Sequence, residues 1–157
     1  MAILTIDNKD DEKFLRKKMR EFAFEKYGKK EIRAFLKTMR EVMHGAHGIG
    51  LAANQIGIDA AVFVVQNEGK SYALFNPIIT HHSAEKNVAE EGCLSVPKRY
   101  GERERSERVV LEAFDANGRK IKIKAWGLLA RIFQHETDHL NGKLFIDEAK
   151  NVHEMET

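Results

Sequence analysis

The sequence of 157 residues predicts an α+β domain, in which N-terminal helices are followed by short strands and then by a final helix. Three observations predict this class. Two amphipathic segments open the chain, four β-type runs occupy its middle, and a largely apolar segment of helical spacing follows them. Because helices and strands are grouped and do not alternate, we expect short antiparallel or mixed sheets packed around the last helix. Residues 1–157 are predicted to form a single domain, with a short polar tail from about residue 148.

The first part of the chain contains two predicted helices. Residues 10–27 carry apolar side chains at helical spacing, and Gly28 directly after them supplies a stop. Residues 31–44 repeat the pattern, with an apolar side formed by Ile32, Phe35, Leu36, Met39 and Met43. A loop rich in small residues, GAHGIGLAANQIG at 45–57, separates this second helix from the strands.

Four runs of β-branched and aromatic residues are predicted to be strands. They lie at 60–66, 72–79, 108–115 and 120–126. The DANG sequence at 115–118 is typical of a tight turn, so the last two runs are expected to form a hairpin. Residues 127–142 are then predicted to form a helix that stops at Gly142.

The composition favours a globular protein of a reducing compartment. Hydrophobic residues make up 43% and charged residues 32% of the chain, and the net charge of +2 gives no argument for an acidic partner. The single cysteine, Cys93, has no internal partner for a disulfide. The N-terminal sequence turns acidic after a few apolar residues, which is not the pattern of a signal or transit peptide. No apolar run has the length of a membrane span, so we expect a cytoplasmic protein without a membrane partner.

Two basic clusters, at 13–20 and 98–105, are the only features that suggest nucleic-acid binding. Glutamates lie in or beside both clusters, and no RNA-binding signature accompanies them. This pattern is more typical of solvated faces, so no specific nucleic-acid binding is expected.

The predicted last helix contains the sequence HETDH at 135–139, which has the pattern H-E-x-x-H. Residues four apart lie on one helical face, about 6 Å from each other, so His135 and His139 can bind one metal ion. Glu136 lies about 100° further round the helix, where it can act as a general base without being a ligand. The alternative is a surface helix that happens to contain two histidines, but the apolar surroundings argue against it.

A hydrolytic metal site needs a third protein ligand and one open position. Phe145 stands where longer versions of the motif have another histidine, and the later glutamates, Glu148, Glu154 and Glu156, lie in the polar tail. Upstream, the candidates are Cys93 and the histidines His44, His47, His81 and His82. The histidines border a glycine loop or a polar turn. Cys93 is preferred because a thiolate binds zinc or iron strongly, although a lone cysteine is also common as a small buried hydrophobe.

Together with Cys93, three stretches in this order make the sequence resemble the peptide deformylase family: GIGLAANQ at 48–55, EGCLS at 91–95 and QHETDHLNG at 134–142. The resemblance extends over roughly residues 31–147. It implies a metal-dependent hydrolase that removes the formyl group from the N-terminal formyl-methionine of nascent peptides and releases formate. It also implies one divalent metal ion per chain, with Fe²⁺ as the first expectation and Zn²⁺, Ni²⁺ or Co²⁺ as alternatives.

The resemblance also implies roles for individual residues. The metal ligands would be Cys93, His135 and His139, and the general acid/base would be Glu136. The side-chain amide of Gln55 and the backbone N–H of Leu94 would stabilise the developing oxyanion. Gly50 would hydrogen-bond the substrate backbone and Ile49 and Ile132 would line the methionine pocket, while Glu91 and Gly92 would lie along the same cleft.

Several positions depart from the family pattern or extend it. The family has an arginine where Arg105 stands, and we expect this residue to pair with Asp138. An arginine that often contacts the substrate in the family would fall at or near Tyr100, beside Arg99, and Arg103 replaces an apolar residue. The resemblance leaves a transient ribosome contact open, but the tail has no basic helix of the kind that some members use for it.

Two other functions are weighed against deformylation. One is a metallohydrolase of another small amide or peptide, which would keep Glu136 and the metal but lose the methionine pocket. The other is a catalytically silent relative that binds metal or a partner. A silent relative would be expected to lack Gln55, Cys93 or Glu136, and all three are present.

Overall fold

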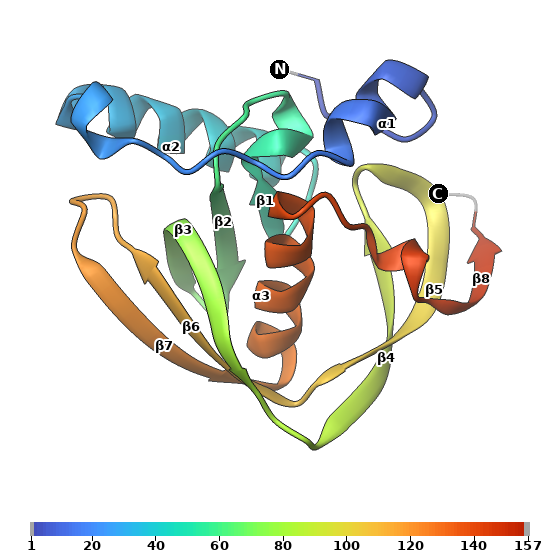
Figure 1. Ribbon diagram of the computed structural model, residues 1–157. Helices are drawn as coiled ribbons and strands as arrows, with labels where there is room; N and C mark the ends of the chain where they lie inside the picture. Colours follow the sequence, from blue (N-terminus) through green and yellow to red (C-terminus); the bar gives the residue numbers. More distant parts are fainter. Residues whose placement is uncertain (1, 156–157) are drawn as a thin grey trace.

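Two antiparallel sheets lie on either side of the helix α3 (Gly127–Leu140) in the computed structural model, which describes residues 2–155 (Figure 1). The larger sheet has the strand order β1-β2-β3-β6-β7 and the smaller one the order β4-β5-β8. The strands of the larger sheet are β1 (Gly50–Ala52), β2 (Val62–Asn67), β3 (Lys70–His82), β6 (Arg108–Phe114) and β7 (Lys120–Trp126). Those of the smaller sheet are β4 (Lys86–Cys93), β5 (Val96–Ser106) and β8 (Lys150–Glu154). The predicted α+β class is confirmed, and all strand pairs are antiparallel.

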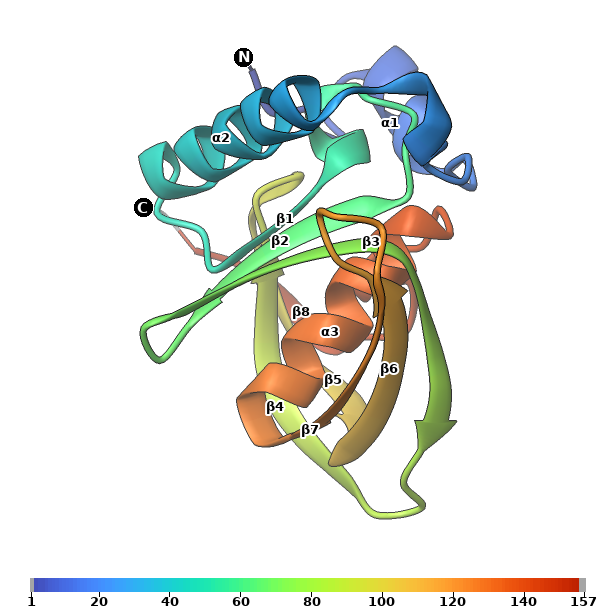
Figure 2. The same ribbon diagram turned by 90° about the vertical axis from the view of Figure 1, so that its left-hand side faces the viewer.

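Two N-terminal helices, α1 (Lys9–Leu15) and α2 (Lys29–Gly45), cover one end of this arrangement. Figure 2 shows α2 lying over β1 and β2. The predicted helix at 31–44 is therefore confirmed, as are the hairpin of β6 and β7 and the final helix. None of the helices among the described residues combines the length and apolar character needed to cross a membrane.

The prediction of one helix over 10–27 was wrong. The helix ends at Leu15, and the chain then runs in a largely extended path to a single 3-10 turn, Phe24–Lys26. Backbone N–H groups that a helix would use internally donate instead to distant partners: Met19 to the Leu140 carbonyl and Phe22 to Asn76 Oδ1. Leu15, Met19 and Phe22 are still buried. Their spacing therefore predicted burial correctly, but it did not correspond to a helix.

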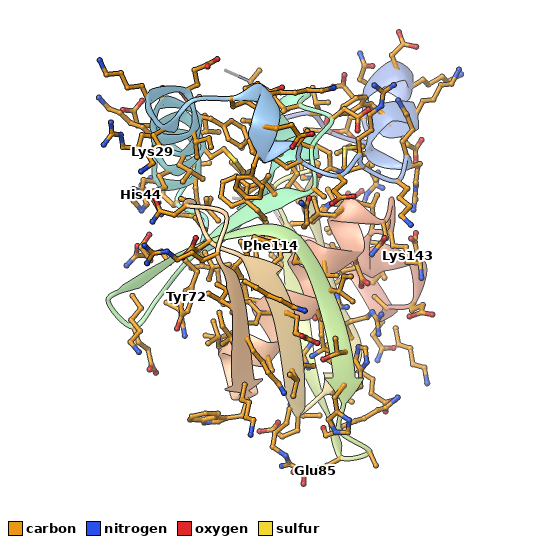
Figure 3. All side chains as sticks on the ribbon, turned by 60° about the vertical axis from the view of Figure 1, so that its left-hand side comes forward. Lys29, His44, Tyr72, Glu85, Phe114 and Lys143 are labelled. Atoms are coloured by element: carbon orange, nitrogen blue, oxygen red, sulfur yellow. The ribbon has the colours of Figure 1, made fainter. Side chains whose placement is uncertain are left out.

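The core has two main parts, one on each face of the larger sheet. On one face, Ala130, Phe133 and Leu140 of α3 pack against a buried layer that includes Phe63, Leu74 and Leu111. On the other face, Ile32, Leu36, Met39 and Met43 of α2 pack against side chains of the 51–64 region and Phe75. An aromatic contact between Phe24 and Phe114 extends this second part, and Figure 3 shows the position of Phe114. The strands β1 and β2 are therefore covered on both faces, by α2 and by α3, whereas the outer face of β7 is exposed.

Residues 86–106, for which no strand was predicted, form β4 and β5. Their sequence is rich in Lys, Arg and Glu because much of the smaller sheet faces solvent, and the turn around Glu85 lies at the end of the molecule away from α2 (Figure 3). The predicted polar tail contains the exposed strand β8, which pairs Tyr100 with His153. The short strand β1 lies in the small-residue loop.

Gly142, two residues after the end of α3, is predicted to be necessary for stability. Its φ is +75°, and a Cβ atom there would lie 2.2 Å from the carbonyl oxygen of Arg16. We expect Gly142→Ala to lower the free energy of unfolding by about 3 kcal/mol and the melting temperature by roughly 6–12 °C. Gly69→Ala is the matched control, because Gly69 has a similar φ of +76° but open space around it. Equal melting temperatures for the two variants would rule out the backbone contact as a cause.

Candidate metal centre

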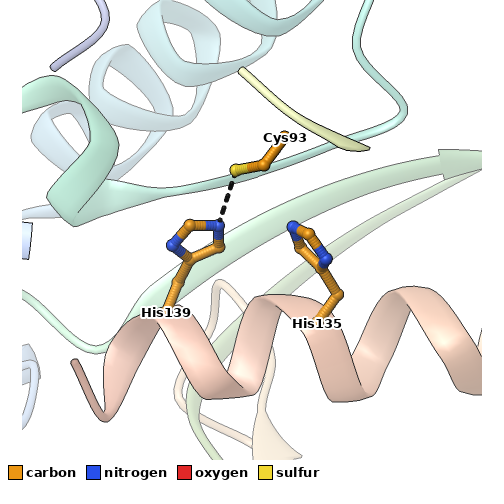
Figure 4. Close-up of side chains that lie close together, drawn as sticks. All are labelled: Cys93, His135 and His139. Carbon is orange, nitrogen blue, oxygen red and sulfur yellow. Dashed lines mark hydrogen bonds between the residues drawn. The ribbon is translucent and has the colours of Figure 1, made fainter. Parts of the chain in front are cut away.

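Three potential metal ligands meet between α3 and the end of β4. His135 and His139 lie one helical turn apart on α3, and Cys93 is the last residue of β4. The Sγ atom of Cys93 lies 3.2 Å from Nε2 of His139, and one ligand atom from each of the three residues falls within 4.8 Å of the others (Figure 4). The structure therefore brings together the three residues predicted to be ligands. His44, His47, His81 and His82 belong to no such group among residues 2–155.

The chemistry of this group fits a divalent transition metal. Burial lowers the pKa of His139 well below its usual value, which keeps the imidazole neutral, as a ligand must be. At His135, burial also lowers the pKa, but hydrogen bonds with Cys93 and Glu91 outweigh it, so the pKa lies well above the usual value. One sulfur and two nitrogen donors are typical of zinc and iron sites.

Glu91 holds the outer side of His135. Its Oε1 lies 2.9 Å from Nδ1 of His135, which turns the opposite nitrogen, Nε2, towards Cys93. Arg105 donates to both carboxylate oxygens of Glu91, each at 2.9 Å. Burial raises the pKa of Glu91, but these hydrogen bonds outweigh it and hold the pKa well below the usual value. Glu91 was predicted to lie along the cleft. It does line the cavity, but its carboxylate is engaged with His135 and Arg105.

The predicted pair of Arg105 and Asp138 is confirmed, with Nη1 of Arg105 2.6 Å from Oδ2 of Asp138. The pair is not a solvent-exposed surface pair, because Arg105 is only 4% exposed. Arg105 thus joins two carboxylates from β4 and α3. Through Glu91, Arg105 helps to hold the candidate ligand His135 in place.

Glu136 points into the same space from the next position of α3. It is 4% exposed, and its Oε1 atom has no hydrogen-bond partner among the described residues. Burial raises its pKa to about 7. A carboxyl group with a pKa near neutrality can both accept and return a proton, which is the property that a general acid/base requires.

Gln55 is fixed with its amide nitrogen towards the metal ligands. It lies in the 3-10 turn Ala53–Ile56, where its Oε1 accepts from the backbone N–H of Ala52 at 2.9 Å. Its Nε2 donates to Oγ of Ser95 at 3.1 Å and lies 3.7 Å from Sγ of Cys93. Ser95 was not singled out from the sequence, although it lies in the EGCLS stretch. Its buried hydroxyl helps to set which way the amide of Gln55 faces.

A cavity of about 440 Å³ opens beside these groups. Its walls include the residues predicted to lie along the substrate, namely Ile49, Gly50, Glu91, Gly92 and Ile132, and also Leu94, the predicted oxyanion donor. Tyr100 forms another part of the wall and covers Gly92, where a Cβ atom would lie 2.6 Å from the tyrosine ring. A larger groove of about 850 Å³ contains none of the three metal ligands. We therefore take the smaller cavity as the candidate active site.

Known proteins resemble this chain in both sequence and fold. The family model described as polypeptide deformylase matches residues 2–155. The chain belongs to the peptide deformylase family. A peptide deformylase of Treponema pallidum is 48% identical to it over 117 residues, which cover 74% of the chain and 72% of that protein. Membership confirms the family resemblance and makes the chain a metal-dependent hydrolase.

Solved deformylase structures agree with this fold. A peptide deformylase from Thermotoga maritima gives a TM-score of 0.86 at 35% identity, covering 95% of the chain and 97% of that protein. A peptide deformylase from Synechococcus elongatus, solved in complex with actinonin, also gives a TM-score of 0.86, at 36% identity, covering 96% of the chain and 79% of that protein. The deformylase fold thus extends over nearly the whole chain.

In this deformylase fold, Gly50 is predicted to be required for activity. A Cβ atom at Gly50 would lie 2.6 Å from Oε2 of Glu136, so an alanine must displace that carboxylate. We expect Gly50→Ala to lower the hydrolysis rate by about 10²-fold, because small displacements of a catalytic group have effects of this size. Gly45→Ala is the control, since a Cβ at Gly45 meets nothing within 4 Å. An active Gly50→Ala variant would contradict the tight packing of Glu136 against β1.

Proposed function

We propose that the chain removes the N-formyl group from the N-terminal formyl-methionine of nascent peptides and releases formate, with the residues of the candidate metal centre in the roles given below. One observation carries the proposal. Cys93, His135 and His139 meet beside the cavity, with the unpartnered oxygen of Glu136 and the fixed amide of Gln55 next to them. Amide hydrolysis needs these components, namely an activated water, a proton carrier and a donor to the oxyanion.

Cys93, His135 and His139 are the proposed ligands of one divalent ion per chain. The ion would act as a Lewis acid that lowers the pKa of a water molecule and polarises the formyl carbonyl. We propose Fe²⁺ as the native ion. The donor set suits it, and Zn²⁺, Ni²⁺ and Co²⁺ are the alternatives. Metal analysis of protein purified without oxygen tests this assignment, and zinc at full occupancy would overturn it.

Glu136 is the proposed proton carrier. Within residues 2–155 its Oε1 atom has no hydrogen-bond partner, so it can accept a proton from the attacking water. The same carboxyl group can then donate that proton to the leaving amine of the methionine. The burial of Glu136 supports this role, because a solvated carboxylate has a lower pKa and would accept the proton from water less readily.

Two donors are proposed for the oxyanion that forms on the formyl group. The first is Nε2 of Gln55, whose orientation is set by Ala52 and Ser95. The second is the backbone N–H of Leu94, the residue after Cys93. Such a preorganised donor is worth about 3 kcal/mol in the transition state, since it needs no reorganisation as charge develops.

The cavity walls supply the proposed substrate contacts. Gly50 and Gly92 present backbone to the cavity, because Glu136 and Tyr100 occupy the space where their side chains would lie. A peptide can therefore approach this backbone closely, and Gly50 is proposed to hydrogen-bond it. Ile49 and Ile132 are proposed to contact the methionine side chain, with Glu91 part of the cleft wall. The substrate is formed on ribosomes, so we propose the cytoplasm as the site of action and a transient ribosome contact.

Formate release from a formyl-Met tripeptide tests the function. The protein should be purified without oxygen and its metal content measured in parallel. We expect rapid release with about one ion per chain, and release from the acetylated tripeptide slower by about 10²-fold or more, because the larger acyl group changes the fit at the reacting carbon. No release from a fully loaded protein would overturn the proposal. Equal rates on both peptides would instead indicate a general amide hydrolase.

A further inference from the structure

Arg131 is a buried cation on α3, one helical turn before His135, and it has no role in the chemistry described above. It is 7% exposed and lines the cavity next to Ile132. Its Nη1 donates to Oε2 of Glu91 and, at 2.9 Å, to the carbonyl oxygen of Arg103. Its Nη2 donates to both oxygens of Asn87, with the backbone carbonyl at 3.1 Å. The guanidinium therefore makes four hydrogen bonds to two neighbouring strands.

These contacts join the two elements that carry the metal ligands. Asn87 and Glu91 belong to β4, which ends at Cys93, whereas Arg131 shares α3 with His135 and His139. The separation of Cys93 Sγ from the imidazoles depends on how β4 sits against α3. Arg131 fixes this separation at a point one turn away from the first histidine.

Arg131 also acts on the carboxylate that orients His135. Glu91 receives Arg105 from β5 on both oxygens and Arg131 from α3 on Oε2, while its Oε1 contacts Nδ1 of His135. Two arginines on different elements restrict the carboxylate from two directions. A restricted Glu91 holds the ring of His135 in one orientation, and such support commonly accounts for 10–100-fold in metal affinity.

We propose that Arg131 is a positioning residue for the metal site, acting through Glu91 on His135 and through Asn87 on the spacing of β4 from α3. The inference rests on the proposed function only in that the site binds a divalent ion. It does not depend on the identity of the substrate.

The test is a titration of the metal-free chain with Co²⁺, following the absorption that a thiolate ligand gives to this ion. We expect Arg131→Met to weaken Co²⁺ binding by about 10–100-fold and to alter the absorption spectrum. Arg131→Lys keeps the charge beside Glu91 but loses the planar fork, so an intermediate loss of about 3–10-fold is expected. Arg103→Met is the matched control, because the Arg103 side chain pairs with Glu148 at 2.7 Å, lies 3.9 Å from Asp138 and makes no hydrogen bond to Glu91. We expect its affinity to stay within about twofold of the unsubstituted chain.

The outcomes separate this inference from the proposed function. If Arg131→Met folds and binds Co²⁺ with unchanged affinity and spectrum, Arg131 has a merely structural role and the inference is overturned, while the proposed function stands. If Arg131→Met does not fold, Arg131→Lys decides in the same way. If the unsubstituted chain itself does not bind Co²⁺, both proposals fail, and this arm shows it before any variant is compared.

Discussion

Glu136→Gln is expected to hydrolyse a formyl-Met tripeptide about 10²–10⁴-fold more slowly than the unsubstituted chain while it retains the same amount of metal. Glutamine has nearly the same shape as glutamate, so it fits against Gly50, where the present carboxylate oxygen lies closest. It cannot accept and return a proton. The loss therefore isolates proton transfer from binding and from folding.

The experiment pairs initial rates of formate release with metal analysis of the same protein batch. Glu136→Asp is a useful companion, because it keeps the carboxyl group but withdraws it from the site, and it should retain part of the activity. A Glu136→Gln protein that hydrolyses at the full rate would show that another group carries the proton. Loss of metal together with activity would instead place Glu136 among the ligands.

Cys93→Ala is expected to be isolated without bound metal and to release formate at no more than the background rate. The sulfur is one of only three proposed protein ligands, and it is the only one that β4 contributes. Two imidazoles on one helix hold a divalent ion weakly without a third ligand from elsewhere in the fold. Metal analysis after dialysis measures the effect directly.

Ser95→Ala is the matched control for Cys93→Ala. Ser95 is buried two residues further along and accepts from Gln55, but it is not among the proposed ligands. It should keep its metal, and any fall in its activity would reflect a misdirected amide at Gln55. Full metal occupancy in Cys93→Ala would instead indicate that one of the upstream histidines is the third ligand.

The parts of this molecule that could be predicted from sequence are those fixed by short-range spacing. His135 and His139 are four positions apart on an apolar segment, so their common face follows from helical geometry. The two β-type runs that became β6 and β7 flank a DANG turn, and this local pattern likewise specifies a hairpin. In both cases the residues that determine the structure are close in sequence.

The wrong and missing elements depend on distant residues. The segment after Leu15 has apolar residues at helical spacing, but its backbone N–H groups donate to Leu140 and Asn76. No local sequence pattern indicates these distant partners. β4 and β5 are highly charged because one of their faces is solvated, so strand propensity alone did not identify them. Cys93 could be named only from its chemistry and the family resemblance, since tertiary structure alone brings it to α3.

The supporting residues of the site were also missed, with the exception of Arg105 and Asp138. Asn54 donates to the carbonyl oxygen of His139 at 2.7 Å, and Ser95 orients Gln55, yet both are ordinary polar residues in sequence. Arg131 did carry a signal. It is a charged residue in the apolar first half of α3, one turn before a candidate metal ligand, and such a residue must find buried partners.

The position of the three ligands in the chain has a consequence for folding. The strands β5, β6 and β7 lie between Cys93 and His135 in sequence, so an ion bound by both residues would cross-link the smaller sheet to α3 and close a long loop. The ion would bind the folded chain and not the unfolded one. At a free-ion concentration one hundred times the dissociation constant, this binding adds about 2.7 kcal/mol to the free energy of unfolding. Oxidative loss of the ion would then make the chain easier to unfold and to degrade. The lifetime of this protein in the cell would depend on its metal supply.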